Sequence, residues 1–341
     1  MKNLLNKIKL AAFTLATAML LVSCGFDQSG LKPSTGKTNE MLVITDNVAT
    51  WNSQVGQTIQ SFFGQPQQGL PQPEATFDIA HVPEDNFSKL FKTHHNIFIV
   101  DIDHSIDKPI IETRKDLWAK PQRVVKMTVP DRETFFAEFG DKKEAFIELF
   151  NANERRRASE AYASIEDYKI TDMLMEKYEV DMLIPKSFTV ATKKEDFVWL
   201  RREAERFSQG IMIWHYPYTD TIAFTYGRLV EIRDSITKKY VPGPSEGSHM
   251  KIAMIEPPAD KRINFNGNFA VEMRGLWELE GDFMGGPFVS YTLVDQERNR
   301  LVTVDGFVYN PSQEKKDLLR QIEALLYTLT FSGEEEELVQ Q

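Results

Sequence analysis

The chain has 341 residues, of which 42% are hydrophobic and 26% charged, and this composition is typical of a globular protein rather than a disordered or fibrous one. A single cysteine excludes an internal disulfide framework and any zinc or iron–sulfur site with several cysteine ligands. The chain carries 50 acidic and 40 basic residues, a net charge of −10, which argues against a general nucleic-acid-binding surface.

The first residues have the features of a secretion signal. Three lysines precede an apolar stretch at residues 10–22, and no acidic residue occurs before Cys24. About 13 apolar or small residues are too few to cross a bilayer core of roughly 30 Å, so we predict a signal peptide over residues 1–23. The end of this stretch, Leu21-Val22-Ser23-Cys24-Gly25, resembles the bacterial lipoprotein box, in which the cysteine becomes the acylated first residue.

Acylation of Cys24 would hold the protein on a membrane without a transmembrane helix, because each buried methylene contributes about 0.8 kcal/mol. Gly25 follows the cysteine where inner-membrane lipoproteins often carry Asp, so we expect an outer-membrane lipoprotein of the cell envelope that faces the periplasm. The alternative is an ordinary signal peptide with a chance cysteine. Either interpretation places the chain outside the cytoplasm.

The remaining chain divides into four segments. Residues 24–40 are polar and predict a flexible tether, and the Glu-rich residues 333–341 predict an acidic tail. Residues 41–165 predict an N-terminal α+β domain with strands near 41–45, 77–81, 96–102 and 123–129, a helix after residue 47 and a long helix over 131–162. Gly140 marks a candidate break in that long helix, and residues 153–157 (NERRR) predict a solvated face.

Residues 166–332 predict a C-terminal α+β domain that is richer in strands. A hairpin turning at 193–195, strands at 211–216, 269–279, 288–294 and 301–309, and helices after Thr225 and Pro311 follow from the alternation of apolar residues and from the turn residues. Because short turns connect most of the strands, we predict an α+β fold of two domains with mainly antiparallel sheets flanked by helices.

Five segments make the chain similar to a lipoprotein family of the Bacteroidota catalogued as domain of unknown function 4837. They are Asn39-Glu40-Met41-Leu42-Val43, Gly69-Leu70-Pro71-Gln72-Pro73-Glu74, Phe91-Lys92-Thr93-His94, Val241-Pro242-Gly243-Pro244 and Gly281-Asp282-Phe283-Met284-Gly285-Gly286-Pro287-Phe288. The resemblance extends over the whole mature chain and implies a secreted, lipid-anchored protein, but no activity. Residues 291–331 also resemble the end of PsbP-like α/β sandwiches, a likeness of fold alone.

The glycine-rich loop at residues 281–288 is the candidate ligand site. It lies between two strong strands and lacks the Lys-Ser/Thr pair of a phosphate-binding loop. A tight or bulged turn would explain its glycines, and the functional alternative is an apolar lip that receives a peptide or a hydrophobic ligand. The candidate ligand-binding residues are Trp277, Phe283, Met284, Gly285, Gly286 and Phe288.

Histidines and carboxylates around one predicted strand offer an alternative, a hydrolase or metal-dependent enzyme. This cluster consists of His94, His95, Asp101 and Asp103, and His104 follows it. Neighbouring strand residues point to opposite sides, so we expect that His94 and His95 cannot share a metal without a bend in the chain. A strand end stabilised by hydrogen bonds is the favoured interpretation.

Two further patterns suggest catalysis only weakly. His215, with Asp220 after it, is a candidate general base, but a strand histidine beside an aromatic core is the favoured interpretation. Ser245 lies in a G-x-S-x-G sequence, but a predicted helix rather than a strand precedes it and His249 is the one histidine downstream of it, so a Pro/Gly turn is the favoured interpretation. We therefore expect no catalytic residues, metal or cofactor, and favour a non-catalytic module that binds an envelope protein or peptide and no nucleic acid.

Overall fold

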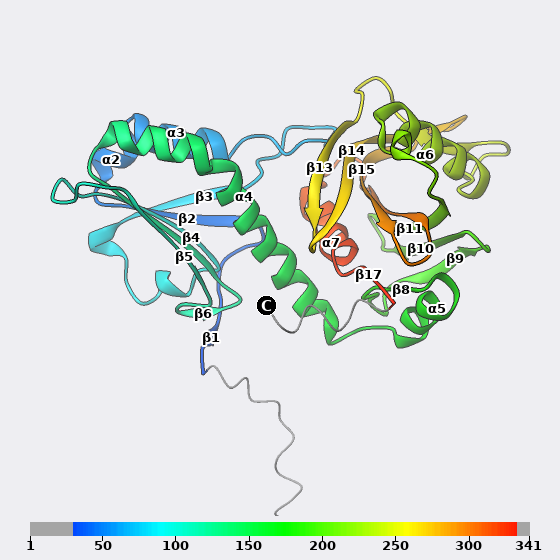
Figure 1. Cartoon of the computed structure of the whole chain (residues 1–341), viewed down its shortest axis with the longest axis horizontal. Helices are drawn as coiled ribbons and strands as arrows, with labels where there is room; N and C mark the ends of the chain where they lie inside the picture. The colour runs from blue at the N-terminus through cyan, green and yellow to red at the C-terminus, as the bar shows by residue number, and fades with distance from the viewer. Residues whose placement is uncertain (1–29, 333–341) are drawn as a thin grey trace, which may run out of the picture.

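The computed structural model describes residues 30–332, so Cys24, the predicted signal peptide and the predicted acidic tail lie outside the described residues. The chain forms two halves, each built on one main sheet, and the long helix α4 (Arg132–Ala163) runs from the first half down against the second (Figure 1). This arrangement confirms the predicted α+β class and two-domain layout. Within residues 30–332, none of the helices has the length and hydrophobicity needed to cross a membrane.

The first half contains a five-stranded sheet with the order β3-β2-β4-β7-β5. Its strands are β2 (Glu40–Thr45), β3 (Asp78–Pro83), β4 (Asn96–Ile102), β5 (Ile110–Lys115) and β7 (Arg123–Val129). The β2–β3, β2–β4 and β4–β7 pairs are parallel and only β5–β7 is antiparallel, so the predicted antiparallel arrangement is wrong for this sheet. The physical reason is that parallel pairing needs long crossover connections. Such connections, including the helices between β2 and β3, bring the chain back to the end of the sheet at which the previous strand began.

Helices cover one face of this sheet. The helices α2 (Val48–Asn52) and α3 (Gln54–Phe63) and the first part of α4 lie over it in Figure 1. Asp131 caps α4 by accepting a hydrogen bond from the backbone N–H of Thr134. Gly140 does not interrupt the helix. The core between the helices and the sheet is rich in buried phenylalanines, namely Phe63, Phe77, Phe98, Phe135, Phe139, Phe146 and Phe150.

The second half contains a curled eight-stranded sheet with the order β12-β14-β15-β16-β11-β10-β9, in which β13 also pairs with β14. Its strands are β9 (Thr189–Lys193), β10 (Phe197–Glu203), β11 (Ser208–Pro217), β12 (His249–Ile252), β13 (Ala259–Phe265), β14 (Asn268–Glu280), β15 (Gly285–Asp295) and β16 (Arg300–Tyr309). Each of these pairings is antiparallel, as predicted for this half.

Helices pack on both faces of the second sheet. The helix α7 (Lys316–Leu326) packs on one face through Leu319, Ile322 and Leu325, and α6 (Tyr226–Tyr240) packs on the other through Leu229. The helix α5 (Tyr168–Tyr178) joins the α7 side. Short elements complete the described chain, namely β1 (Lys32–Pro33), β6 (Ala119–Lys120), β8 (Val180–Asp181), β17 (Thr330–Phe331), η2 (Glu84–Asn86), η3 (Phe91–Thr93) and η4 (Thr221–Phe224).

The two halves are joined by buried polar contacts along α4 and α7. The carboxylate of Glu74, from the first half, accepts hydrogen bonds of 2.8–3.1 Å from the backbone N–H groups of Lys315 and Lys316, which start α7. The Arg155 guanidinium lies 3.9 Å from the Tyr327 ring, and its Nη1 is 3.4 Å from Glu323 Oε1. The prediction of a solvated face at residues 153–157 is therefore wrong, because the second half and the N-terminal residues cover much of it.

The prediction of a flexible tether over residues 24–40 also fails for its described part. The residues of β1 pair in parallel with β6, and the backbone N–H of His95 donates to the carbonyl of Thr35 at 3.0 Å. Asn39 is completely buried in the left-handed conformation, with a φ of 58°. The chain from Leu31 to Asn39 is thus part of the folded first half.

Candidate functional site

A cavity of about 330 Å³ opens on the α6 side of the second sheet. Its position follows from strand alternation, since Trp199 on β10, Trp277 on β14 and Phe307 on β16 all belong to the apolar cluster on that face. The main apolar side chains of its wall are Trp199, Met250, Trp277, Leu279, Met284 and Phe307. The volume and the aromatic lining are typical of a pocket for a small apolar ligand.

Specific contacts hold the aromatic walls in place. The indole Nε1 of Trp277 donates to the carbonyl of Val308 at 3.2 Å, and its ring meets that of Phe307 edge-on, with centroids 5.4 Å apart. A Cβ at Gly210 would lie only 2.2 Å from the Phe307 ring, so the glycine leaves room for that ring. Among the described residues, Nε1 of the buried Trp199 has no hydrogen-bond partner, which leaves one free donor in a residue that lines the cavity.

The polar side chains of the cavity lie at the end formed by β10 and β11. The side chain of Gln209 lies on the opposite face of the sheet, since its Nε2 donates to the carbonyl of Leu318 on α7 at 2.8 Å and its Oε1 accepts from Arg202 at 3.0 Å. The Arg201 guanidinium lies 5.0 Å from the Trp199 ring and forms an ion pair with Glu203. Arg201 is the one ionisable side chain among the described residues that line this cavity.

The residues predicted from the glycine-rich loop fall into three environments. Trp277 and Met284 line the apolar cavity. Phe283, Met284, Gly285 and Gly286 border a second, open hollow of about 590 Å³ that also reaches Pro71 and Lys315, and the Phe283 side chain is completely exposed. Phe288 is completely buried with the Arg233 guanidinium 3.7 Å from its ring, and it lines neither space.

Close backbone contacts explain two of the loop glycines. A Cβ at Gly286 would lie 2.0 Å from the carbonyl oxygen of Val308, and one at Gly285 would lie 2.9 Å from that of Trp277. These glycines therefore allow the strands to approach one another beside the cavity. Sequence reasoning missed Trp199, Met250 and Phe307, because only the strand order brings these residues to Trp277.

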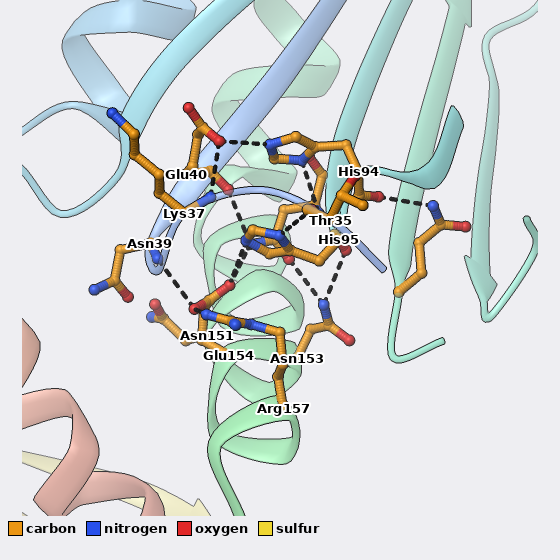
Figure 2. A network of polar contacts seen from close by, with 12 residues as sticks. Thr35, Lys37, Asn39, Glu40, His94, His95, Asn151, Asn153, Glu154 and Arg157 are labelled. Carbon is orange, nitrogen blue, oxygen red and sulfur yellow. Dashed lines mark hydrogen bonds and ion pairs between the residues drawn. The ribbon is translucent and has the colours of Figure 1, made fainter. Parts of the chain in front are cut away.

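His94 and His95 lie just before the strand β4, in a polar network that is separate from the aromatic cavity (Figure 2). The two rings stack with centroids 4.6 Å apart, His94 Nε2 lies 3.1 Å from Glu40 Oε2, and His95 Nε2 lies 2.9 Å from Glu154 Oε1. The expectation that the two rings point to opposite sides is wrong, because both residues precede the regular strand. A Cβ at Gly36 would lie within 2.7 Å of both rings, so the N-terminal segment crosses directly over them.

Burial and the neighbouring opposite charges shift the pKa values of His94 and Glu154 in opposite directions. Burial lowers the pKa of His94, as does the neighbouring His95, and the contact with Glu40 only partly compensates. Burial acts to raise the pKa of Glu154, but the hydrogen bond and charge of His95 and the charge of Arg157 outweigh it and lower this pKa from 4.5 to about 2. The described contacts thus hold Glu154 as a buried carboxylate with several donors.

The histidines and aspartates of the predicted enzyme site do not lie close together in the fold. His94 and His95 lie at the start of β4, whereas Asp101 and Asp103 lie at or beyond its other end. Asp101 is 3.4 Å from Lys126, and Asp103 accepts two hydrogen bonds from Ser105. Across residues 30–332, no three histidines, cysteines or carboxylates are grouped so that they could hold a metal ion.

The other two catalytic candidates lie elsewhere. His215 borders an open, charged hollow in the second half, and burial together with the charge of Arg300 lowers its pKa. The Ser245 hydroxyl donates to Asp282 at 2.6 Å, while Nδ1 of His249 is 3.4 Å from the carbonyl oxygen of Gly247. Neither group adjoins the stacked histidines of the first half.

Solved structures similar to this chain include two of Mog1. A point mutant of Mog1 has 10% identity over 46% of this chain and 93% of its own, with a TM-score of 0.29. The Ran-binding protein Mog1p of Saccharomyces cerevisiae has 8% identity over 45% and 90%, also with a TM-score of 0.29. PA94, a Pseudomonas aeruginosa protein of unknown function, has 15% identity over 39% and 78%, with a TM-score of 0.21. These scores are too low to support an argument, and the likeness to PsbP stays a prediction.

Two family models match separate parts of the sequence, and no curated protein matches it. The model of domain of unknown function 8532 matches residues 34–163, which include the five-stranded sheet, α4 and the stacked histidines. The expectation that one family extends over the whole mature chain is therefore wrong. The model of domain of unknown function 4837 matches residues 167–328, so the resemblance to that family is confirmed for the second half, which contains the aromatic cavity.

Proposed function

We propose that this protein is a lipid-anchored protein of the bacterial cell envelope, of the Bacteroidota lipoprotein type, that binds an apolar ligand without transforming it. The proposed anchor is an acylated Cys24, and the proposed location is the periplasmic face of the outer membrane. The ligand is a hydrophobic small molecule or an apolar side chain of an envelope protein or peptide.

The observation that carries this proposal is the aromatic cavity of about 330 Å³ in the second half. Its one ionisable lining side chain lies at the polar end, and the rest of the wall is mainly apolar. Such a lining favours binding by burial of apolar surface over chemistry on a polar bond.

The enzyme alternative has less support. Its candidate residues are divided between the two ends of β4 and, for His215, the other half of the chain. The two stacked histidines already contact buried or half-buried carboxylates and backbone carbonyls. A general base also needs a nearby reacting group in a pocket, and the described contacts of these rings are with protein groups.

The anchor is tested by replacing Cys24 with Ser. We expect the wild-type protein in the membrane fraction and the C24S variant in the soluble periplasmic or secreted fraction. Mass spectrometry of the wild-type N-terminal peptide should show fatty acyl chains on the cysteine. Unchanged fractionation of the variant, or an unacylated wild-type terminus, would contradict the anchor without affecting the ligand proposal.

The cavity is tested with N-phenylnaphthylamine, a neutral dye whose fluorescence rises in apolar surroundings. We expect saturable binding to the purified protein and a loss of affinity of about tenfold or more in Met284→Arg, which places a charge in the wall. The matched control is Phe283→Arg, because Phe283 is the preceding loop residue and does not line the apolar cavity. Equal affinity in both variants, or no saturable binding, would contradict the proposal.

A further inference from the structure

We infer that the ligand of the aromatic cavity is an amphiphile with an apolar chain and an anionic head group, and that Arg201 pairs with that head group. This inference rests on the proposed function and specifies its ligand. The ligand we infer is a fatty carboxylate. Its alkyl chain lies between the aromatic walls, and its carboxylate lies at the end of the cavity formed by β10 and β11.

The distribution of polar groups around the cavity supports an elongated ligand with one polar end. Arg201, Ser208 and Gln209 come from the end of β10 and the start of β11, while Trp277, Leu279 and Met284 come from β14 and the loop after it. Because the Gln209 side chain lies on the α7 face of the sheet, Arg201 is the strongest donor at the polar end.

Arg201 is positioned to receive a carboxylate. Its guanidinium lies 5.0 Å from the Trp199 ring, which restricts the side chain and favours a defined orientation of its N–H groups. Trp199 and Arg201 are two residues apart on β10, so both side chains lie on the same face of the sheet.

The existing partner of Arg201 does not prevent such binding. Glu203 forms an ion pair with Arg201, but 56% of the Glu203 side chain and 43% of the Arg201 side chain are exposed. Exposed pairs of this kind contribute little, whereas a guanidinium can hold a ligand carboxylate through two parallel hydrogen bonds at the edge of an apolar cavity. Glu203 should therefore compete with the head group, and its removal should strengthen binding.

The experiment compares decanoate, decanol and decyltrimethylammonium, which share one chain length and differ in head-group charge. Each amphiphile displaces N-phenylnaphthylamine from the purified wild-type protein and from three variants, R201Q, E203Q and R206Q. Arg206 is the matched control, because it is an exposed arginine of the same β10–β11 hairpin and does not line the cavity.

We expect the wild-type protein to bind decanoate about tenfold more tightly than decanol, and decyltrimethylammonium most weakly. R201Q should abolish the preference for decanoate while leaving decanol affinity unchanged, E203Q should increase the preference, and R206Q should retain it. If R201Q does not fold, the response of E203Q still tests the pairing, since an unchanged preference there would count against it.

The failure of this inference differs from the failure of the proposed function. Equal affinities for decanoate and decanol, or a preference that survives R201Q, would overturn the role of Arg201 and leave an apolar ligand site in place. Absence of displacement by all three amphiphiles, together with no saturable binding of the dye, would overturn both.

Discussion

Glu154 offers the sharpest test of how the first half is held together. Its carboxylate accepts hydrogen bonds from the backbone N–H of Asn39 at 3.1 Å, from Asn96 Nδ2 at 2.7 Å and from Arg157 Nη2 at 3.0 Å, and it contacts His95. The substitution Glu154→Gln keeps the size of the side chain but replaces one acceptor oxygen with an N–H donor that faces other donors. The variant should therefore lose most of the network while its packing changes little.

The pKa of Glu154 sets the size of the expected effect. A pKa lowered from 4.5 to about 2 corresponds to about 3 kcal/mol of folding free energy at neutral pH, since a tenfold change in proton affinity is worth about 1.4 kcal/mol. Because the pKa is lower in the folded state, this stabilisation is fully present above pH 4.5 and is lost as the pH falls from 4.5 towards 2. We expect Glu154→Gln to destabilise the protein by about 3 kcal/mol at pH 7 and by progressively less below pH 4.5.

Urea unfolding followed by circular dichroism, repeated between pH 7 and pH 2.5, measures both quantities. The control is Glu144→Gln on the same helix, whose side chain is exposed, so that it should change the free energy of unfolding by about 1 kcal/mol or less. The reasoning is refuted if Glu154→Gln costs under about 1 kcal/mol at pH 7, or if its cost does not shrink in acid.

Three further stability predictions use the same unfolding measurement. Trp277→Ala should cost about 3–5 kcal/mol, because the side chain is almost completely buried; a cost below about 1 kcal/mol would contradict its place in the core. Glu74→Ala should cost about 2 kcal/mol by leaving two backbone N–H groups of α7 without an acceptor, and an unchanged unfolding curve would show that this cap contributes nothing. Gly286→Ala should cost about 1–3 kcal/mol through a clash with the backbone, whereas Gly140→Ala, with open space around it in a helix, should stabilise by about 0.5–1 kcal/mol; equal effects would refute the steric argument.

Local sequence patterns were sufficient to predict most individual elements. The apolar spacing of Phe135, Phe139 and Phe146 indicates α4, and the turn residues at 193–195 indicate the hairpin of β9 and β10. Strand direction in the first half depends on the path of the connections, which the local pattern does not show. The near-continuous apolar runs of β2 and β4 are nevertheless typical of buried parallel strands, a signal that the prediction of antiparallel sheets did not use. The start of the last helix was misplaced at Pro311, since the cap that fixes its start at Lys316 comes from Glu74, far away in the sequence.

Only some residues of the candidate site could be predicted from the sequence. The glycine-rich loop led to Trp277 and Met284, which line the cavity, but also to Phe288, which packs in the core. Trp199 and Phe307 are far from the loop in the sequence and carry no local signal of a site. The charged residues at 153–157 predicted solvent exposure because the pattern does not reveal that another part of the chain will cover them.

The ordered N-terminal segment limits how far the protein can stand from its proposed membrane anchor. If residues 24–40 formed a fully flexible linker, the folded domains could lie as far as about 60 Å from the bilayer, at 3.3–3.6 Å per residue. Because the chain from Leu31 onward is fixed to the first half, only residues 24–30 remain to span the gap, and their full length is at most about 25 Å. If Cys24 is acylated as proposed, Leu31 and the part of the first half beside it stay within about 25 Å of the lipid headgroups.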